Sequence, residues 1–154
     1  MEGPSTFKTI PLTRAFAVFR KVCLDTFPDP DAFDGAVEKA GLGFVKEPAT
    51  RPGWHRWSQG GRYLTLELKG RMEDGRAFQQ CRFRVAVPEE LSEEARMKAI
   101  GDALAPGRPH VERYGLGAWD LGGDEPTRLE LLPASPDTRV FDLSVRRFLK
   151  EEPD

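Results

Sequence analysis

Apolar residues recur at helical spacing in three stretches of the chain. Residues 13–27 place an apolar side chain at every third or fourth position, with Thr13 as the N-cap and a proline stop after them. Residues 30–40 repeat this pattern and are followed by Gly41, which suits a left-handed C-terminal cap. Residues 89–105 form the third stretch, and their early glutamates complement the positive end of a helix dipole. The pattern therefore predicts three amphipathic helices.

Between the second and third helices, polar and apolar residues alternate in the manner of half-buried strands. Leucine occupies every second position in residues 62–69, and residues 76–87 alternate in the same way. Asp74 and Gly75 suit a two-residue hairpin turn, because both positions need positive φ. This turn predicts cross-strand pairs that join apolar residues on one face and polar residues on the other: Leu68 with Cys81, Leu66 with Phe83, Leu64 with Val85, Glu67 with Arg82, and Thr65 with Arg84.

After the third helix, the alternation returns in residues 110–122, 127–132 and 138–150. The order is therefore two helices, an antiparallel meander, a helix and a second meander. This order predicts the α+β class: an antiparallel β-sheet of about five to six strands in two meanders, with about three helices packed on one face.

The totals fit one ordinary domain. The chain has 154 residues, of which 39% are apolar and 31% are charged, with both signs mixed. A chain of this length can bury a sizeable core without metal or disulfide support. Because no stretch has the composition of a linker, we expect a single globular domain over residues 1–154, with residues 1–10 and 151–154 as loose termini.

Charge and hydropathy exclude several classes of partner. A formal net charge of -2 and an isoelectric point near 5.8 argue against nucleic acid or an anionic membrane surface as the partner. No apolar run approaches the ~20 residues that span a bilayer. The first residues, MEGPSTFKTIP, lack an apolar core of signal-peptide length. We therefore expect a soluble, cytoplasmic protein, although a leader missing from this sequence would change that expectation.

The acidic stretch DPDAFDG, residues 29–35, resembles the start of a calcium loop. Such a loop needs oxygen ligands where this chain has Phe33 and Ala40, so calcium binding is not supported. The stretch instead suits a helix start, with Asp29 or Asp31 as the N-cap and a proline in the first turn.

Cys23 and Cys81 are the only cysteines, and both lie on predicted inward faces. Two buried free thiols are the ordinary intracellular outcome, while a disulfide is the alternative if the Cα atoms lie within roughly 7 Å. Together with His55 and His110, the cysteines match no zinc-site spacing. Neither cysteine has the electropositive surroundings of a catalytic thiol. We expect no metal and no cofactor.

Residues 52–58, PGWHRWS, have the most unusual local composition. Their aromatic and basic side chains suit stacking and cation–π contacts with a ligand, while the alternative is an edge strand in which both tryptophans cover the core. The glycine-rich segment 113–126 lacks the spacing of a phosphate loop and suits a bent strand or a binding loop. For the arginines of the hairpin's polar face, an ion-pair lattice with Glu67 is favoured over an anion site. The candidate residues for ligand or partner binding are Trp54, His55, Arg56, Trp57, Arg82, Arg84, Tyr114 and Trp119.

The chain contains no serine-nucleophile or phosphate-loop motif. The favoured function is therefore a small non-enzymatic binding or protein-interaction domain, with another protein or a small ligand as its partner. Its surface would be centred on the Trp54–Trp57 segment and the Gly115–Gly123 loop.

Two alternatives remain open. The first is a small hydrolase or transferase that uses His55 or His110 as a base, oriented by Asp120 or Asp124. The second is an envelope protein without its leader, marked by a disulfide between the two cysteines.

Overall fold

The computed structural model describes residues 9–113, 116–132 and 139–150. Within these ranges it confirms the α+β class. The helices are α1 (Leu12–Phe19), which continues into the π-helical segment η1 (Arg20–Leu24), α2 (Pro30–Ala40) and α3 (Glu93–Leu104). The strands are β1 (Val45–Lys46), β2 (Trp54–Gln59), β3 (Arg62–Arg71), β4 (Ala77–Ala86), β5 (His110–Arg113), β6 (Leu116–Gly122), β7 (Thr127–Leu131) and β8 (Val140–Phe148).

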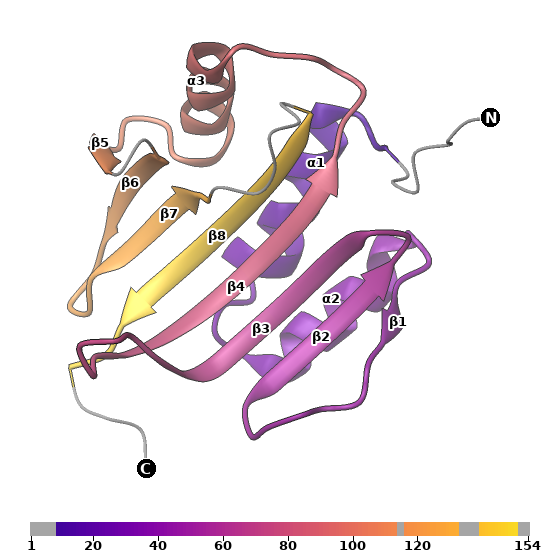
Figure 1. Ribbon diagram of the computed structural model, residues 1–154, viewed down its shortest axis with the longest axis vertical. Coiled ribbons are helices and arrows are strands. Elements are labelled where there is room, and N and C mark those ends of the chain that lie inside the picture. Colours follow the sequence, from indigo (N-terminus) through magenta and orange to yellow (C-terminus); the bar gives the residue numbers. More distant parts are fainter. Residues whose placement is uncertain (1–8, 114–115, 133–138, 151–154) are drawn as a thin grey trace.

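These eight strands of the described residues form one open sheet in the order β1-β2-β3-β4-β8-β7-β6-β5, with every neighbouring pair antiparallel. The two predicted meanders form the two halves of the sheet, and their last strands, β4 and β8, pair at the centre (Figure 1). The sheet has more strands than the five to six predicted. One reason is the two-residue edge strand β1; the other is that residues 110–122 fold into two strands, β5 and β6.

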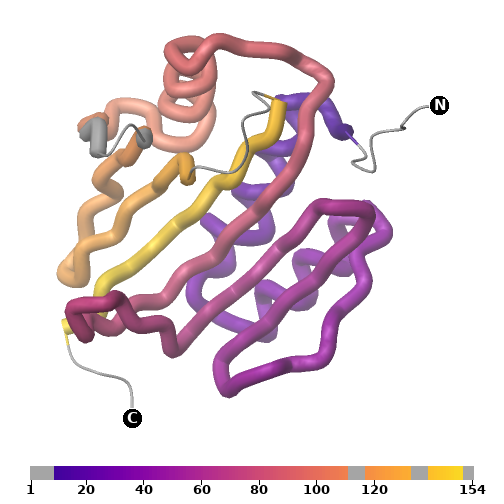
Figure 2. The backbone as a smooth tube through the Cα atoms, in the orientation of Figure 1, coloured from indigo at the N-terminus to yellow at the C-terminus, as the bar shows by residue number. Residues whose placement is uncertain are grey.

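All three helices cover one face of the sheet, as predicted. Figure 2 shows the α1 and α2 segments running behind the strands. The register joins Trp119 of β6 to Cys81 of β4 in one cross-strand row, through β7 and β8, so these side chains point to the same face. On that face Cys81 is bonded to Cys23 of η1, and Trp119 packs against Gly101 of α3. The opposite face of the sheet carries no helix of the described residues.

The β3–β4 hairpin has the predicted strands and faces, but its predicted register is wrong by two residues. Leu64 lies opposite Phe83, where the prediction has Leu66. The turn is the loop of residues 73–75, in which Gly75 takes a left-handed φ of 91°, and a β-bulge in β3 adds the remaining offset. A shift of two residues keeps each side chain on its predicted face, because the side-chain period of a strand is two.

The helix α2 begins and ends where the sequence predicts. The Asp29 carboxylate accepts hydrogen bonds from the amides of Asp31 and the following residue at 3.0 and 3.2 Å. Gly41 closes the helix with a left-handed φ of 68°. DPDAFDG is therefore a capped helix start. In contrast, α3 begins later than predicted, because Ser92 supplies its N-cap.

Cys23 of η1 and Cys81 of β4 form a disulfide, with their Cα atoms 5.5 Å apart. Both residues are 0% exposed. The bond joins the helix layer to a central strand across a sequence separation of 58 residues. Of the two outcomes that the sequence left open, the structure contains the disulfide.

Candidate functional site

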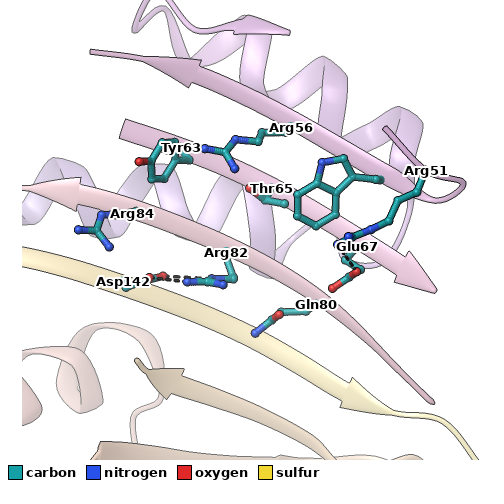
Figure 3. A pocket seen from close by; sticks show the side chains of 10 residues that line it. Arg51, Arg56, Tyr63, Thr65, Glu67, Gln80, Arg82, Arg84 and Asp142 are labelled. Carbon is teal, nitrogen blue, oxygen red and sulfur yellow. Dashed lines mark hydrogen bonds and ion pairs between the residues drawn. The ribbon is translucent and has the colours of Figure 1, made fainter. Parts of the chain in front are cut away.

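The uncovered face of the sheet carries a small pocket of about 240 Å³ over β2, β3, β4 and β8. Alternate residues of these strands line it, because successive strand side chains point to opposite faces. Figure 3 shows the lining residues: Arg51, Trp54, Arg56, Tyr63, Thr65, Glu67, Gln80, Arg82, Arg84 and Asp142. Four of the predicted binding residues, Trp54, Arg56, Arg82 and Arg84, thus meet in one place.

Arg82 and Asp142 form an ion pair within the pocket lining. Arg82 donates from Nε to Oδ1 at 3.3 Å and from Nη2 to Oδ2 at 2.6 Å, and the Asp142 side chain is only 1% exposed. The predicted pair of Glu67 with Arg82 is wrong. The observed register places Glu67 opposite Gln80, while the pairing of β4 with β8 brings Asp142 to the arginine.

Two further arginines stack on aromatic rings at the edge of the pocket. The Arg51 guanidinium lies 4.1 Å from the centre of the Trp54 ring and donates a hydrogen bond to Glu67 at 2.7 Å. The Arg56 guanidinium lies 4.2 Å from the centre of the Tyr63 ring. Cation–π attraction thus adds to charge pairing in fixing the position of the Arg51 side chain.

Arg84 differs from the other three arginines. Among the described residues its side chain makes no hydrogen bond or ion pair, and its Nε is buried. Arg56 Nε is also buried without a hydrogen bond, but it lies 3.3 Å from Glu47 Oε2 and so has an ion-pair partner. Asp142 is the cross-strand neighbour of Arg84, but both oxygens of Asp142 already accept hydrogen bonds from Arg82. Within the part of the chain described, the pocket thus contains a cation with no partner.

The PGWHRWS segment is divided between the two faces of the sheet. Trp54 and Arg56 point into the pocket, while His55 and Trp57 point toward the helices. The interpretation in which both tryptophans cover the core is therefore wrong, since strand residues three apart point in opposite directions. Trp57 is 7% exposed and belongs to the core.

The carboxylate of Asp34 on α2 contacts His55 and Trp57, the two residues of that segment that face the helices. Trp57 Nε1 donates to Oδ1 at 2.8 Å, Lys46 Nζ donates to Oδ2 at 2.8 Å, and His55 Nδ1 lies 3.3 Å from the same Oδ2. Burial raises the pKa of Asp34, but the hydrogen bonds from Lys46 and Trp57 and the charges of Lys46 and His55 outweigh it, so the pKa lies below its ordinary value. The cluster ties α2 to β1 and β2, which makes Asp34 a structural anchor.

The remaining predicted site residues that the structure describes lie away from the pocket. Trp119 is 3% exposed beneath α3, and its ring centre lies 4.9 Å from that of His110. Tyr114 and Gly115 lie outside the described residues. The rest of the predicted Gly115–Gly123 loop is largely strand β6 (Leu116–Gly122). Asp120, a proposed partner for a histidine base, accepts a hydrogen bond from the Gly122 amide at 2.8 Å.

Sequence reasoning missed about half of the pocket lining. The leucine alternation of β3 carries a signal that places Tyr63, Thr65 and Glu67 together on the polar face. No comparable signal identifies Asp142, because its position depends on the pairing of β4 with β8, two strands from different meanders.

Among the described residues, no group of three or more histidine, cysteine, aspartate or glutamate side chains could hold a metal ion. No helix in the described part of the chain is long and apolar enough to cross a membrane. Comparison of the chain with family models, with curated proteins and with solved structures found no match in any of the three. The functional argument therefore depends on the pocket itself.

Proposed function

We propose that this chain is a small binding domain that holds a ligand in the pocket on the uncovered face of its sheet. The lining of the pocket carries the proposal. Guanidinium groups, two hydroxyls, an amide and two aromatic rings converge on one concave site, as they do in ligand-binding pockets. Most of them stand on paired strands, which hold a site more precisely than loops.

The chemistry of the lining favours binding over covalent catalysis. The pocket residues include no histidine, cysteine or serine, so the Thr65 hydroxyl has no imidazole base beside it. The contact of His55 with Asp34 lies on the helix side of the sheet, and the same carboxylate also binds Trp57 and Lys46. That histidine therefore serves the packing of α2.

The size of the pocket indicates what it would hold. Its volume of about 240 Å³ is below the ~300–1,000 Å³ of typical sites for drug-sized ligands. The proposed occupant is accordingly a small molecule, or the head group of one whose remainder stays in solvent.

A pocket-filling variant tests this function. Thr65 is 8% exposed on the pocket floor, so Thr65→Tyr would fill the space above it. The control is Gly35→Tyr on α2, where an added Cβ meets nothing within 4 Å. Saturation-transfer NMR would screen small carboxylates, phosphates, aromatic amides and sugars. We expect at least one probe to bind the wild type and the control but not Thr65→Tyr. A screen in which every binder tolerates Thr65→Tyr refutes the proposal.

We also propose that the domain works in an oxidising compartment, which is the envelope alternative applied to a binding domain. The buried disulfide supports this, because such bonds are rare where thiols are kept reduced. The test is to quench native cells with acid, denature the protein and label free thiols with a maleimide polymer. We expect labelling only after reduction; complete labelling without a reductant contradicts the proposal.

A further inference from the structure

The pocket has an excess of positive charge, although the chain has a formal net charge of -2. Four arginines line it against two carboxylates, and each carboxylate already binds one arginine. Arg56 pairs with Glu47, which lies outside the pocket lining. These three arginines thus each pair with a different carboxylate, and Arg84 is the exception.

A buried guanidinium N–H without an acceptor is unfavourable, and arginine cannot relieve the cost by losing its proton. Arg84 Nε is in this position, since it is buried and has no partner among the described residues. Its cross-strand neighbour Asp142 is committed to Arg82. No acceptor for Arg84 Nε lies within the described part of the chain.

The strand register places further polar groups around Arg84. Tyr63 is its direct partner on β3, at an interstrand spacing of about 5 Å. Thr65 stands two residues along the same strand on the same face, opposite Arg82. The two hydroxyls can each donate a hydrogen bond to an oxygen held by the Arg84 fork. The Trp54 ring, on which the Arg51 guanidinium stacks, also lines the pocket.

We propose that this pocket binds an oxyanion, the carboxylate or phosphate group of a small molecule, and that Arg84 is its anchor. The inference rests on the proposed function and names the ligand chemistry of the same pocket. A guanidinium fork binds two oxygens of one carboxylate or phosphate at once, which fixes the orientation of the anion as well as holding its charge. The body of the ligand would then lie along the Trp54 ring.

Three matched aromatic probes test the proposal by calorimetric titration: benzoate, phenyl phosphate and the neutral benzamide. We expect one or both anions to bind the wild type and benzamide to bind at least about tenfold more weakly, as the loss of charge-assisted hydrogen bonds requires. The anion that binds more tightly identifies the source chemistry. Affinity should fall as salt is added.

Variants locate the anchor. Arg84→Gln should weaken anion binding by about tenfold or more. Arg84→Lys keeps the charge but loses the two-pronged guanidinium, so its affinity should lie between those of wild type and Arg84→Gln. Arg14→Gln is the control, since Arg14 is exposed on α1 on the other side of the sheet. Tyr63→Phe is a second test that leaves Arg84 in place. It removes one hydroxyl donor and should raise the Kd for the anion several-fold. Thermal melting confirms that each variant folds.

The outcomes separate this inference from the proposed function. Anions that bind Arg84→Gln and wild type equally overturn the anchor, as does a wild type that binds neither anion. The oxyanion inference is overturned if benzamide binds wild type as tightly as benzoate does and loses its binding in Thr65→Tyr. That result would still support the proposed binding pocket.

Discussion

Removal of the Cys23–Cys81 disulfide gives the sharpest test of how this fold is held together. The perturbation is the double variant Cys23→Ala/Cys81→Ala, which avoids the buried hydroxyls that serine would introduce. Both cysteines are 0% exposed and belong to the core cluster. The bond fastens the helix layer to β4, one of the two central strands.

The magnitude follows from the length of chain that the bond closes. A sequence separation of 58 residues corresponds to about 4 kcal/mol of unfolded-state entropy at 25 °C in the chain-entropy relation. Loss of the two buried sulfur atoms adds about 1 kcal/mol for the small cavity left behind. Together this is a large share of the ~5–15 kcal/mol by which domains are stable.

The assay is urea unfolding followed by tryptophan fluorescence, because Trp57 and Trp119 are both buried. We expect the double variant to lose about 4–5 kcal/mol of unfolding free energy, and its m-value to rise slightly because the unfolded chain becomes less compact. Wild type refolded under reductant keeps both sulfur atoms and should lose only the loop-closure part, about 4 kcal/mol, and the double variant should not respond to reductant. A loss under about 1 kcal/mol, with an unchanged m-value, would refute the assignment of this stability to loop closure.

Four other predictions follow from substitutions at single positions. The carboxylate of Asp34 has a pKa below its ordinary value of 3.8, so its contribution to stability is present above that pH and is lost as pH falls through the lower folded value. Asp34→Asn should therefore be less stable than wild type at pH 7, and the difference in unfolding free energy should close below about pH 4. A difference that does not depend on pH contradicts this prediction. Gly70→Ala places a Cβ against the Phe78 ring and should cost about 1–3 kcal/mol in thermal unfolding. Gly35→Ala, in open space on α2, should instead stabilise by about 0.5–1 kcal/mol, and equal effects at the two sites would show the predicted clash to be absent. Arg82→Ala leaves the Asp142 carboxylate, which is 1% exposed, without its donors and should cost about 3 kcal/mol of unfolding free energy. The double variant Arg82→Ala/Asp142→Ala should recover part of that loss. Effects of the two substitutions that simply add would argue against the pair.

Local chemistry predicted the elements well where one residue controls a boundary. Asp29 and Gly41 determine both ends of α2, and each acts within a few residues of its own position. The faces of β3 and β4 were also predictable, because alternation depends only on the period of the backbone. The register was not, since it depended on the shape of the turn before Ala77 and on a bulge in β3.

The candidate site was half predictable for the same reason. Trp54 and Arg56 attract attention through composition, and the alternation of the hairpin places Arg82 and Arg84 on its polar face. Their different roles depend on Asp142, which lies 60 residues after Arg82 and reaches it only because β4 pairs with β8. A single sequence has no pattern that announces this pairing.

By itself, the sequence determined what each segment is: which residues form helices, which alternate in strands, and which side of each strand is apolar. These properties follow from backbone periodicity and from caps that act over a few residues. Only the tertiary structure decided which segments meet. The joining of two meanders at β4 and β8, the closure of Cys23 with Cys81, and the isolation of Arg84 beside a committed Asp142 are all long-range pairings. Each is selected by packing of the whole chain, because many local patterns are compatible with several partners and only one arrangement buries them all together.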